Sequence, residues 1–130
     1  RLKPLADIEA VRLSLTANDA PAFYFDREKL FQALYNVLDN CLKYASSQVS
    51  MESHFVNGDL TINIKDDGPG FTPGEEDKVF KRFYKGPHGG SGIGLAISKA
   101  VVEGHGGTIM AKNAPQGGAE FLITLPPKSF

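Results

Sequence analysis

Residues 26–45, DREKLFQALYNVLDNCLKYA, carry the strongest helix pattern in the chain, and the rest of the fold follows outward from them. Asp26 is a good N-cap, because its carboxylate can accept a hydrogen bond from a backbone N–H of the first turn. Apolar residues then recur every three or four positions, as one buried helix face requires: Leu30, Leu34, Val37, Leu38, Cys41 and Ala45. The pattern predicts a helix over Arg27–Ala45 that packs on a core.

The composition indicates one globular domain. The 130 residues are 42% hydrophobic and 22% charged. Fourteen Lys and Arg against fifteen Asp and Glu leave a net charge of −1, so no basic surface for nucleic acid is expected. The single cysteine excludes an internal disulfide and a multi-cysteine zinc site. No apolar run approaches the roughly 18 residues of a membrane-spanning helix. We expect one cytoplasmic domain over residues 1–130, without nucleic-acid or membrane contacts of its own.

Strand patterns lie on both sides of the helix. Residues 11–15 alternate between apolar and polar, and residues 22–24 are a candidate for a short partner strand. After the helix come two longer runs, Gln48–Val56 and Asp59–Lys65. They are joined by Asn57-Gly58, a dipeptide that favours a type I′ hairpin because both residues tolerate positive φ.

The last third of the chain adds a second helix and two more strands. Gly92–Glu103 has helical periodicity and ends at Gly104, and strands are predicted over Thr108–Lys112 and Glu120–Leu125. Helices and strands thus alternate along the chain. This order predicts an α/β (α+β) two-layer sandwich, with a mixed, mainly antiparallel sheet of about five strands packed on about three helices.

Polar residues lie beside the apolar stripe of the first helix. At about 100° per residue, Asn36, Asn40 and Lys43 fall within an arc of about 60°, and Tyr44 lies between that arc and the stripe. Two amides, an amine and a phenol at a groove edge suit a cation, a phosphate and a stacked base. A solvated helix face is the ordinary alternative, and the helix alone leaves both interpretations open.

Two glycine-rich segments suit a ligand as well. Asp66-Asp67-Gly68-Pro69-Gly70 follows a predicted strand, where a carboxylate can accept from an exocyclic amine and glycines allow close approach to a flat ligand. A simple turn is the alternative. Residues 89–97 run directly into the second helix, so N–H groups and the positive helix end face one point that suits phosphate. The motifs of Rossmann and P-loop nucleotide sites are absent.

In this order, the motifs resemble the ATP-binding catalytic domain of sensor histidine kinases, within the superfamily that includes gyrase, chaperone and mismatch-repair ATPases. Residues 34–44 look like the N box of that family, and residues 66–70 like its first glycine box. Residues 79–85 look like its phenylalanine box and residues 90–97 like its second glycine box. A glycine turn at 117–118 precedes the last strand. The resemblance covers nearly the whole chain.

The resemblance implies a role for each polar residue of the first helix and for the aspartate after the strand. Asn40 would be the amide ligand of Mg²⁺, with Asn36 beside it near the metal or the phosphates. Lys43 would meet phosphate, and Asn36 and Lys43 are the catalytic candidates. Tyr44 would lie against adenine, and Asp66 would accept from its 6-amino group.

The glycines and the lid complete the implied ATP site. Gly68 and Gly70 would let the backbone pass close to the base. Backbone N–H groups of the second glycine box would face the phosphates: Gly90, Ser91, Gly92, Gly94 and Leu95. A mobile lid from about Lys81 to Gly90 would cover ATP. Arg82 and Lys85 are candidates for cations that reach the γ-phosphate, and ordinary solvated charges are the alternative.

Two residues depart from the family's pattern. Cys41 replaces the small residue usual after the metal-binding asparagine, and its place on the apolar stripe predicts burial rather than reactivity. Asp67 adds a charge where the family often has a neutral polar residue. If its side chain points to water, that charge has little effect on its neighbours.

The resemblance implies transfer of the γ-phosphoryl group of Mg-ATP to a histidine on a separate dimerisation domain, from which a response regulator receives it. Asn36 stands where the hydrolytic branches carry a water-activating glutamate, and an amide is no general base near neutral pH. None of the three histidines, His54, His88 and His105, has the sequence setting of a phosphoacceptor. We therefore expect this chain to be one domain of a longer protein, and an anchor in the inner membrane would belong to another part of that protein. A serine/threonine anti-sigma-type kinase and a non-catalytic nucleotide-binding module are the alternatives.

Overall fold

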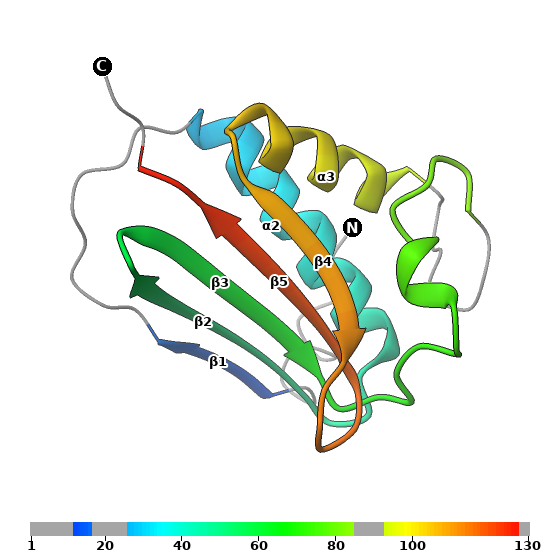
Figure 1. The fold of residues 1–130 in the computed structure, drawn as a ribbon. Coiled ribbons are helices and arrows are strands. Elements are labelled where there is room, and N and C mark those ends of the chain that lie inside the picture. The colour runs from blue at the N-terminus through cyan, green and yellow to red at the C-terminus, as the bar shows by residue number, and fades with distance from the viewer. Residues whose placement is uncertain (1–11, 17–25, 85–92, 128–130) are drawn as a thin grey trace.

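The structure, a computed structural model, describes residues 12–16, 26–84 and 93–127. In chain order, its elements are β1 (Arg12–Thr16), α2 (Arg27–Tyr44), β2 (Gln48–Val56), β3 (Asp59–Asp66), the one-turn 3₁₀ helix η1 (Glu75–Asp77), α3 (Gly94–Gly104), β4 (Thr108–Asn113) and β5 (Ala119–Leu125). Helices α2 and α3 lie together on one face of a five-stranded sheet (Figure 1). The domain therefore has two layers.

The sheet is mixed and mainly antiparallel, as predicted. Its strand order is β1-β2-β3-β5-β4, with β1 parallel to β2 and the other three pairs antiparallel. In place of about three helices, the described residues contain two α-helices and the single turn η1. The predicted strand at 22–24 lies outside the described residues, as does most of the predicted lid, residues 85–90.

The boundaries of the elements follow local sequence chemistry. Asp26 caps α2 as predicted, since its Oδ1 accepts from the N–H of Lys29 at 3.1 Å. The β2–β3 turn has φ of 53° at Asn57 and 88° at Gly58, the two positive values that a type I′ hairpin needs. Helix α2 ends one residue earlier than predicted, and α3 starts two residues later, at Gly94.

One apolar core fills the space between the sheet and the helices. Alternate residues of β3 and β5 face α2 and are buried, among them Ile64, Phe121 and Ile123. Phe71 and Phe80 each form a T-shaped pair with Phe121, with ring centroids 5.7 and 6.1 Å from the Phe121 centroid. Phe80 thereby anchors the phenylalanine box to the core.

Hydrogen bonds join α2 to α3 at three levels. Near the start of α3, the Nδ2 of Asn36 donates to the carbonyl oxygen of Gly94 at 3.1 Å. In the middle, the Oγ of Ser98 donates to the carbonyl oxygen of Ala33 at 2.7 Å. At the far end, the N–H of Asp26 donates to the Nε2 of His105 at 3.0 Å. The two helices therefore pack in opposite directions in one fixed register.

Candidate functional site

The C-terminal half of α2 contacts both glycine-rich segments. Asn36, which is half-buried, holds the first residue of α3 through its hydrogen bond to Gly94. This bond uses the amide nitrogen of Asn36. One turn later, Asn40 is only 6% exposed, and Lys43 lies on the same side of the helix with its side chain in solvent. Exposure along the predicted polar arc is therefore uneven: Asn36 is half-buried, Asn40 is buried and Lys43 is exposed.

Asn40 presents a buried amide oxygen. Asn40 makes other contacts, but its Oδ1 accepts no hydrogen bond from the described residues. An amide oxygen of this kind suits Mg²⁺, which prefers oxygen ligands and keeps positions for water and phosphate. No group of three or more His, Cys, Asp and Glu within the described ranges could hold a metal by itself. A magnesium ion here would need the phosphates as further ligands, so the residues fit a metal that arrives with a nucleotide.

Asp66, the last residue of β3, is held by one carboxylate oxygen. Its side chain is 4% exposed, and its Oδ1 accepts from the N–H of Gly68 at 2.9 Å and from the N–H of Ala119 at 3.1 Å. Its Oδ2 is buried and accepts no hydrogen bond from the part of the chain that the structure describes. A buried acceptor without a donor is costly, so this oxygen suits a donor on a ligand.

We call residues 66–70 the aspartate turn, and it packs directly on α2. A Cβ added to Gly68 would lie 2.2 Å from the carbonyl oxygen of Tyr44, so only glycine allows this approach. The thiol of Cys41 lies beside Asp66. Its pKa is raised well above the ordinary value, first by burial and then by the charge of Asp66. The side chain is fully buried, as predicted, and a raised pKa disfavours the reactive thiolate.

The β4–β5 turn closes against the same aspartate. Gly118 has φ of 89°, and a Cβ there would lie 1.9 Å from the carbonyl oxygen of Asp66. A side chain at this position would collide with backbone that cannot move without displacing β3. The glycine turn noted in the sequence is therefore required by a close approach of two backbones.

The structure describes two of the remaining predicted site residues, Leu95 and Arg82. Leu95 is buried in the first turn of α3, which has no side-chain N-cap. Arg82 is exposed, with its guanidinium carbon 5.4 Å from the ring centroid of Phe83. Four further candidates lie outside the described residues: Lys85, Gly90, Ser91 and Gly92.

Sequence reasoning missed the role of Asp67. Its side chain does not simply point to water: the carboxylate accepts from the backbone N–H groups of Ser46, Ser47 and Gln48 and from the Ser47 hydroxyl. Partial burial raises its pKa, but these hydrogen bonds outweigh that effect and lower the pKa to about 2. Asp67 therefore fixes the loop from α2 to β2. Asp67 and Ser47 are 20 residues apart in the chain, so no local sequence pattern predicts this contact.

Glu75 and Asn113 were also missed. Glu75 is 2% exposed, and it accepts from the N–H of Thr72 at 3.1 Å and from the hydroxyl of Tyr84 at 3.2 Å. Burial raises the pKa of Tyr84, and the neighbouring charge of Glu75 raises it further. This pair ties Tyr84, the last described residue of the predicted lid before the undescribed residues 85–92, to η1. Asn113 binds the backbone that follows the aspartate turn.

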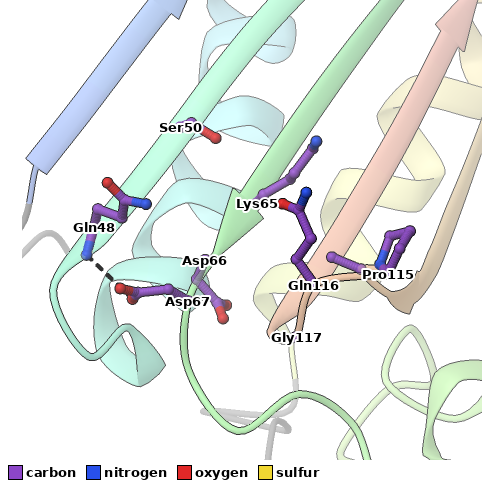
Figure 2. A pocket seen from close by; sticks show the side chains of 9 residues that line it. Gln48, Ser50, Lys65, Asp66, Asp67, Pro115, Gln116 and Gly117 are labelled. Atoms are coloured by element: carbon purple, nitrogen blue, oxygen red, sulfur yellow. Dashed lines mark hydrogen bonds between the residues drawn. The ribbon is translucent and has the colours of Figure 1, made fainter.

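A pocket lies on the face of the sheet opposite to the helices. It has a volume of about 370 Å³ and is lined by residues of β2, β3 and the β4–β5 turn: Gln48, Ser50, Lys65, Asp66, Asp67, Ala114, Pro115, Gln116 and Gly117. Figure 2 shows it with α2 behind the sheet, and the dashed line marks the hydrogen bond from the Gln48 N–H to Asp67. Asp66 and Asp67 belong both to the pocket lining and to the aspartate turn, whereas none of the other lining residues belongs to α2 or α3. The pocket therefore adjoins the candidate site and shares the aspartate turn with it.

Comparison with known proteins identifies the family. A family model described as histidine kinase-, DNA gyrase B- and HSP90-like ATPase matches residues 25–129. The chain belongs to this family. The sensor protein KdpD of Escherichia coli (strain K12), a relative, is 39% identical over 123 residues, which cover 90% of this chain and 13% of KdpD.

Solved structures agree with this assignment. The mycobacterial sensor histidine kinase MprB is 33% identical, with a TM-score of 0.81 and coverage of 94% of this chain and 85% of that one. Full-length ShkA in complex with AMPPNP shares the fold at 24% identity, with a TM-score of 0.79. The match covers 94% of this chain and 27% of the ShkA chain. The chain is a histidine-kinase-type catalytic ATPase domain, and it spans a small part of KdpD. Among the described helices, none is long and apolar enough to cross a membrane.

Proposed function

We propose that this domain binds Mg-ATP and transfers the γ-phosphoryl group to a histidine on a separate dimerisation domain of the same protein, and that a response regulator receives it from there. One observation carries the proposal: the three motifs meet on one helix. Asn36 binds Gly94, Cys41 lies beside Asp66, and the Tyr44 carbonyl touches Gly68. Full-length ShkA, which has this fold, was solved with AMPPNP, in keeping with a nucleotide here.

Asp66 is the residue that would recognise adenine. Its Oδ1 is occupied by two backbone N–H groups, which fix the carboxylate plane, and its buried Oδ2 is an acceptor. The 6-amino group of adenine is a donor, so it fits this oxygen, whereas the 6-keto group of guanine does not. Tyr44 would lie along the base, and Gly68 and Gly70 would let the backbone approach it.

The phosphates would lie between α2 and the start of α3. Asn40 would hold the magnesium ion, which neutralises charge on the phosphates when bound. Lys43 would add a positive charge, and Arg82 and Lys85 would add others from the lid. Backbone N–H groups of the second glycine box would donate hydrogen bonds to the phosphate oxygens: those of Gly90, Ser91, Gly92, Gly94 and Leu95. The uncapped first turn of α3 supports this arrangement.

The site favours transfer to another protein group over hydrolysis. Asn36 cannot act as a general base, and its amide nitrogen is engaged with Gly94. In the proposed step, the bond between the γ-phosphorus and the bridging oxygen breaks, a bond from phosphorus to an imidazole nitrogen forms, and Mg-ADP leaves. Of the described histidines, His105 is unsuited as acceptor, because one ring nitrogen accepts from Asp26 and the other bonds Val101.

The test is a transfer assay with labelled Mg-ATP and a matching dimerisation domain. We expect acid-labile label on the histidine of that domain. Label on serine or threonine would instead support an anti-sigma-type kinase. ATP binding without any transfer would support a non-catalytic nucleotide-binding module. If this domain does not bind ATP in the presence of the dimerisation domain, the proposal as a whole is refuted.

A further inference from the structure

Asn113, the last residue of β4, binds one residue beyond the aspartate turn with both atoms of its amide. Its Oδ1 accepts from the N–H of Phe71 at 2.6 Å, and its Nδ2 donates to the carbonyl oxygen of Phe71 at 3.1 Å. The side chain thus satisfies both backbone groups of Phe71 in the way that a neighbouring strand would. Asn113 and Phe71 are 42 residues apart, so this contact joins two distant parts of the chain.

Gly70 lies against the same amide. Its φ is 78°, and a Cβ added to it would lie 2.7 Å from the Oδ1 of Asn113 and 3.4 Å from the carbonyl oxygen of Gly118. Both the conformation and the space at this position favour glycine. The amide of Asn113 therefore sets where the aspartate turn ends.

The turn is held at two points. At its start, the Oδ1 of Asp66 accepts from the N–H of Gly68 at 2.9 Å. At its end, Asn113 holds Phe71, whose buried ring packs edge-on against Phe121 at 5.7 Å. Residues 68–70 therefore lie between a carboxylate and an amide that come from different strands.

We infer that Asn113 is a positioning residue for adenine recognition, which acts by holding the aspartate turn in the conformation that receives the base. The inference rests on the function proposed above. Binding groups must be held within about 0.5 Å of the productive geometry, and Asn113 is the fixed point at the open end of this turn. Without the amide, the backbone of Phe71 loses both partners on β4. The turn then populates other conformations, and the apparent affinity falls with the population of the competent one.

The experiment compares Asn113→Ala with a matched control by titration calorimetry. Asn63 provides the control, because its Nδ2 donates to Glu120 at 2.6 Å on the opposite face of the sheet, away from the turn. The two probes are Mg-ATP and magnesium tripolyphosphate, which has no base. For Asn113→Ala we expect about a tenfold loss of affinity for Mg-ATP, as two hydrogen bonds would give, and no change for tripolyphosphate. Asn63→Ala is expected to bind both probes like the wild type.

A second variant keeps the inference testable if Asn113→Ala does not fold. Asn113→Asp keeps an acceptor for the Phe71 N–H but places a carboxylate oxygen opposite the Phe71 carbonyl, so we expect a loss of Mg-ATP affinity at least as large. Amide hydrogen exchange at Phe71 should also be faster in either variant, whereas Asn63→Ala should leave it unchanged.

Three outcomes would overturn the inference. One is wild-type affinity for Mg-ATP in the Asn113 variants. Another is an equal loss for Mg-ATP and tripolyphosphate, since the effect would not pass through the base. The third is a wild-type domain without preference for ATP over GTP, which would remove the proposed adenine recognition as well. The first two outcomes leave the proposed function standing when the wild type prefers ATP.

Discussion

Replacing Asp66 with asparagine changes one buried atom from an acceptor to a donor, and we expect this to reverse the choice of purine. The Oδ1 of Asp66 already accepts from the N–H groups of Gly68 and Ala119. An asparagine oxygen can take over both bonds. The amide nitrogen must then occupy the place of the buried Oδ2, where it opposes the 6-amino group of adenine and matches the 6-keto group of guanine.

The size of the effect follows from the charge on the acceptor. A hydrogen bond to an ionised group contributes about 1.5–3 kcal/mol, so Asp66→Asn should weaken Mg-ATP binding by roughly 10- to 150-fold. Mg-GTP binding should hold steady or improve. Folding stability should fall by less than about 1 kcal/mol, because the two backbone donors keep a partner.

The assay is competition of ATP and GTP against a fluorescent nucleotide, with urea unfolding of the same samples. Asp66→Ala is the matched variant. It removes the acceptor for both backbone N–H groups, so we expect it to lose about 2 kcal/mol or more of stability as well as purine preference. The reasoning is refuted if Asp66→Asn keeps the wild-type ratio of ATP to GTP affinity while it remains folded.

Three further predictions concern the metal, a close contact and pH. Asn40→Ala should lower ATP affinity more than tenfold in Mg²⁺ but leave affinity in EDTA and the circular dichroism spectrum unchanged, and equal affinity in Mg²⁺ would contradict the metal assignment. Gly118→Ala should destabilise the domain by about 3 kcal/mol or more in urea, because its Cβ would lie 1.9 Å from the Asp66 carbonyl; a loss under about 1 kcal/mol would show that the strands separate easily. The carboxylate of Asp67 has its pKa lowered to about 2, so its stabilisation is complete above the ordinary carboxylate pKa and is lost as pH falls through about 2. With allowance for solvent screening, the wild type should lose about 1 kcal/mol of stability through Asp67 between pH 5 and pH 2, and Asp67→Asn should not show this part of the loss. Identical acid unfolding curves for the two proteins would contradict this role of Asp67.

Local chemistry was enough to predict most elements of the fold. Asp26 and the apolar stripe placed α2 within one residue, and Asn57-Gly58 fixed the hairpin and the register of β2 on β3. These features depend on residues close together in the chain. The start of α3 was placed two residues early, because Gly92 continues a glycine-rich run that carries no capping residue.

The tertiary contacts of the site could not be predicted in the same way. Asp67 binds a loop about 20 residues earlier, and Asn113 binds backbone 42 residues earlier. Nothing in the neighbouring residues distinguishes these polar side chains from solvated ones. The need for glycine at 118 likewise depends on where β3 ends beside β5. The roles of Asp67, Asn113 and Gly118 depend on contacts between segments distant in the sequence, so only the three-dimensional structure shows them.

The three hydrogen bonds between α2 and α3 couple the two helices along their whole length. One end of the pair carries Gly94, the first residue of α3, and the opposite end carries His105, which accepts from the N–H of Asp26, the N-cap of α2. A push on that remote end cannot slide one helix along the other without breaking the bond from Ser98 to Ala33. The position of Asn36 relative to Gly94 is therefore tied to contacts along the whole length of the helix pair.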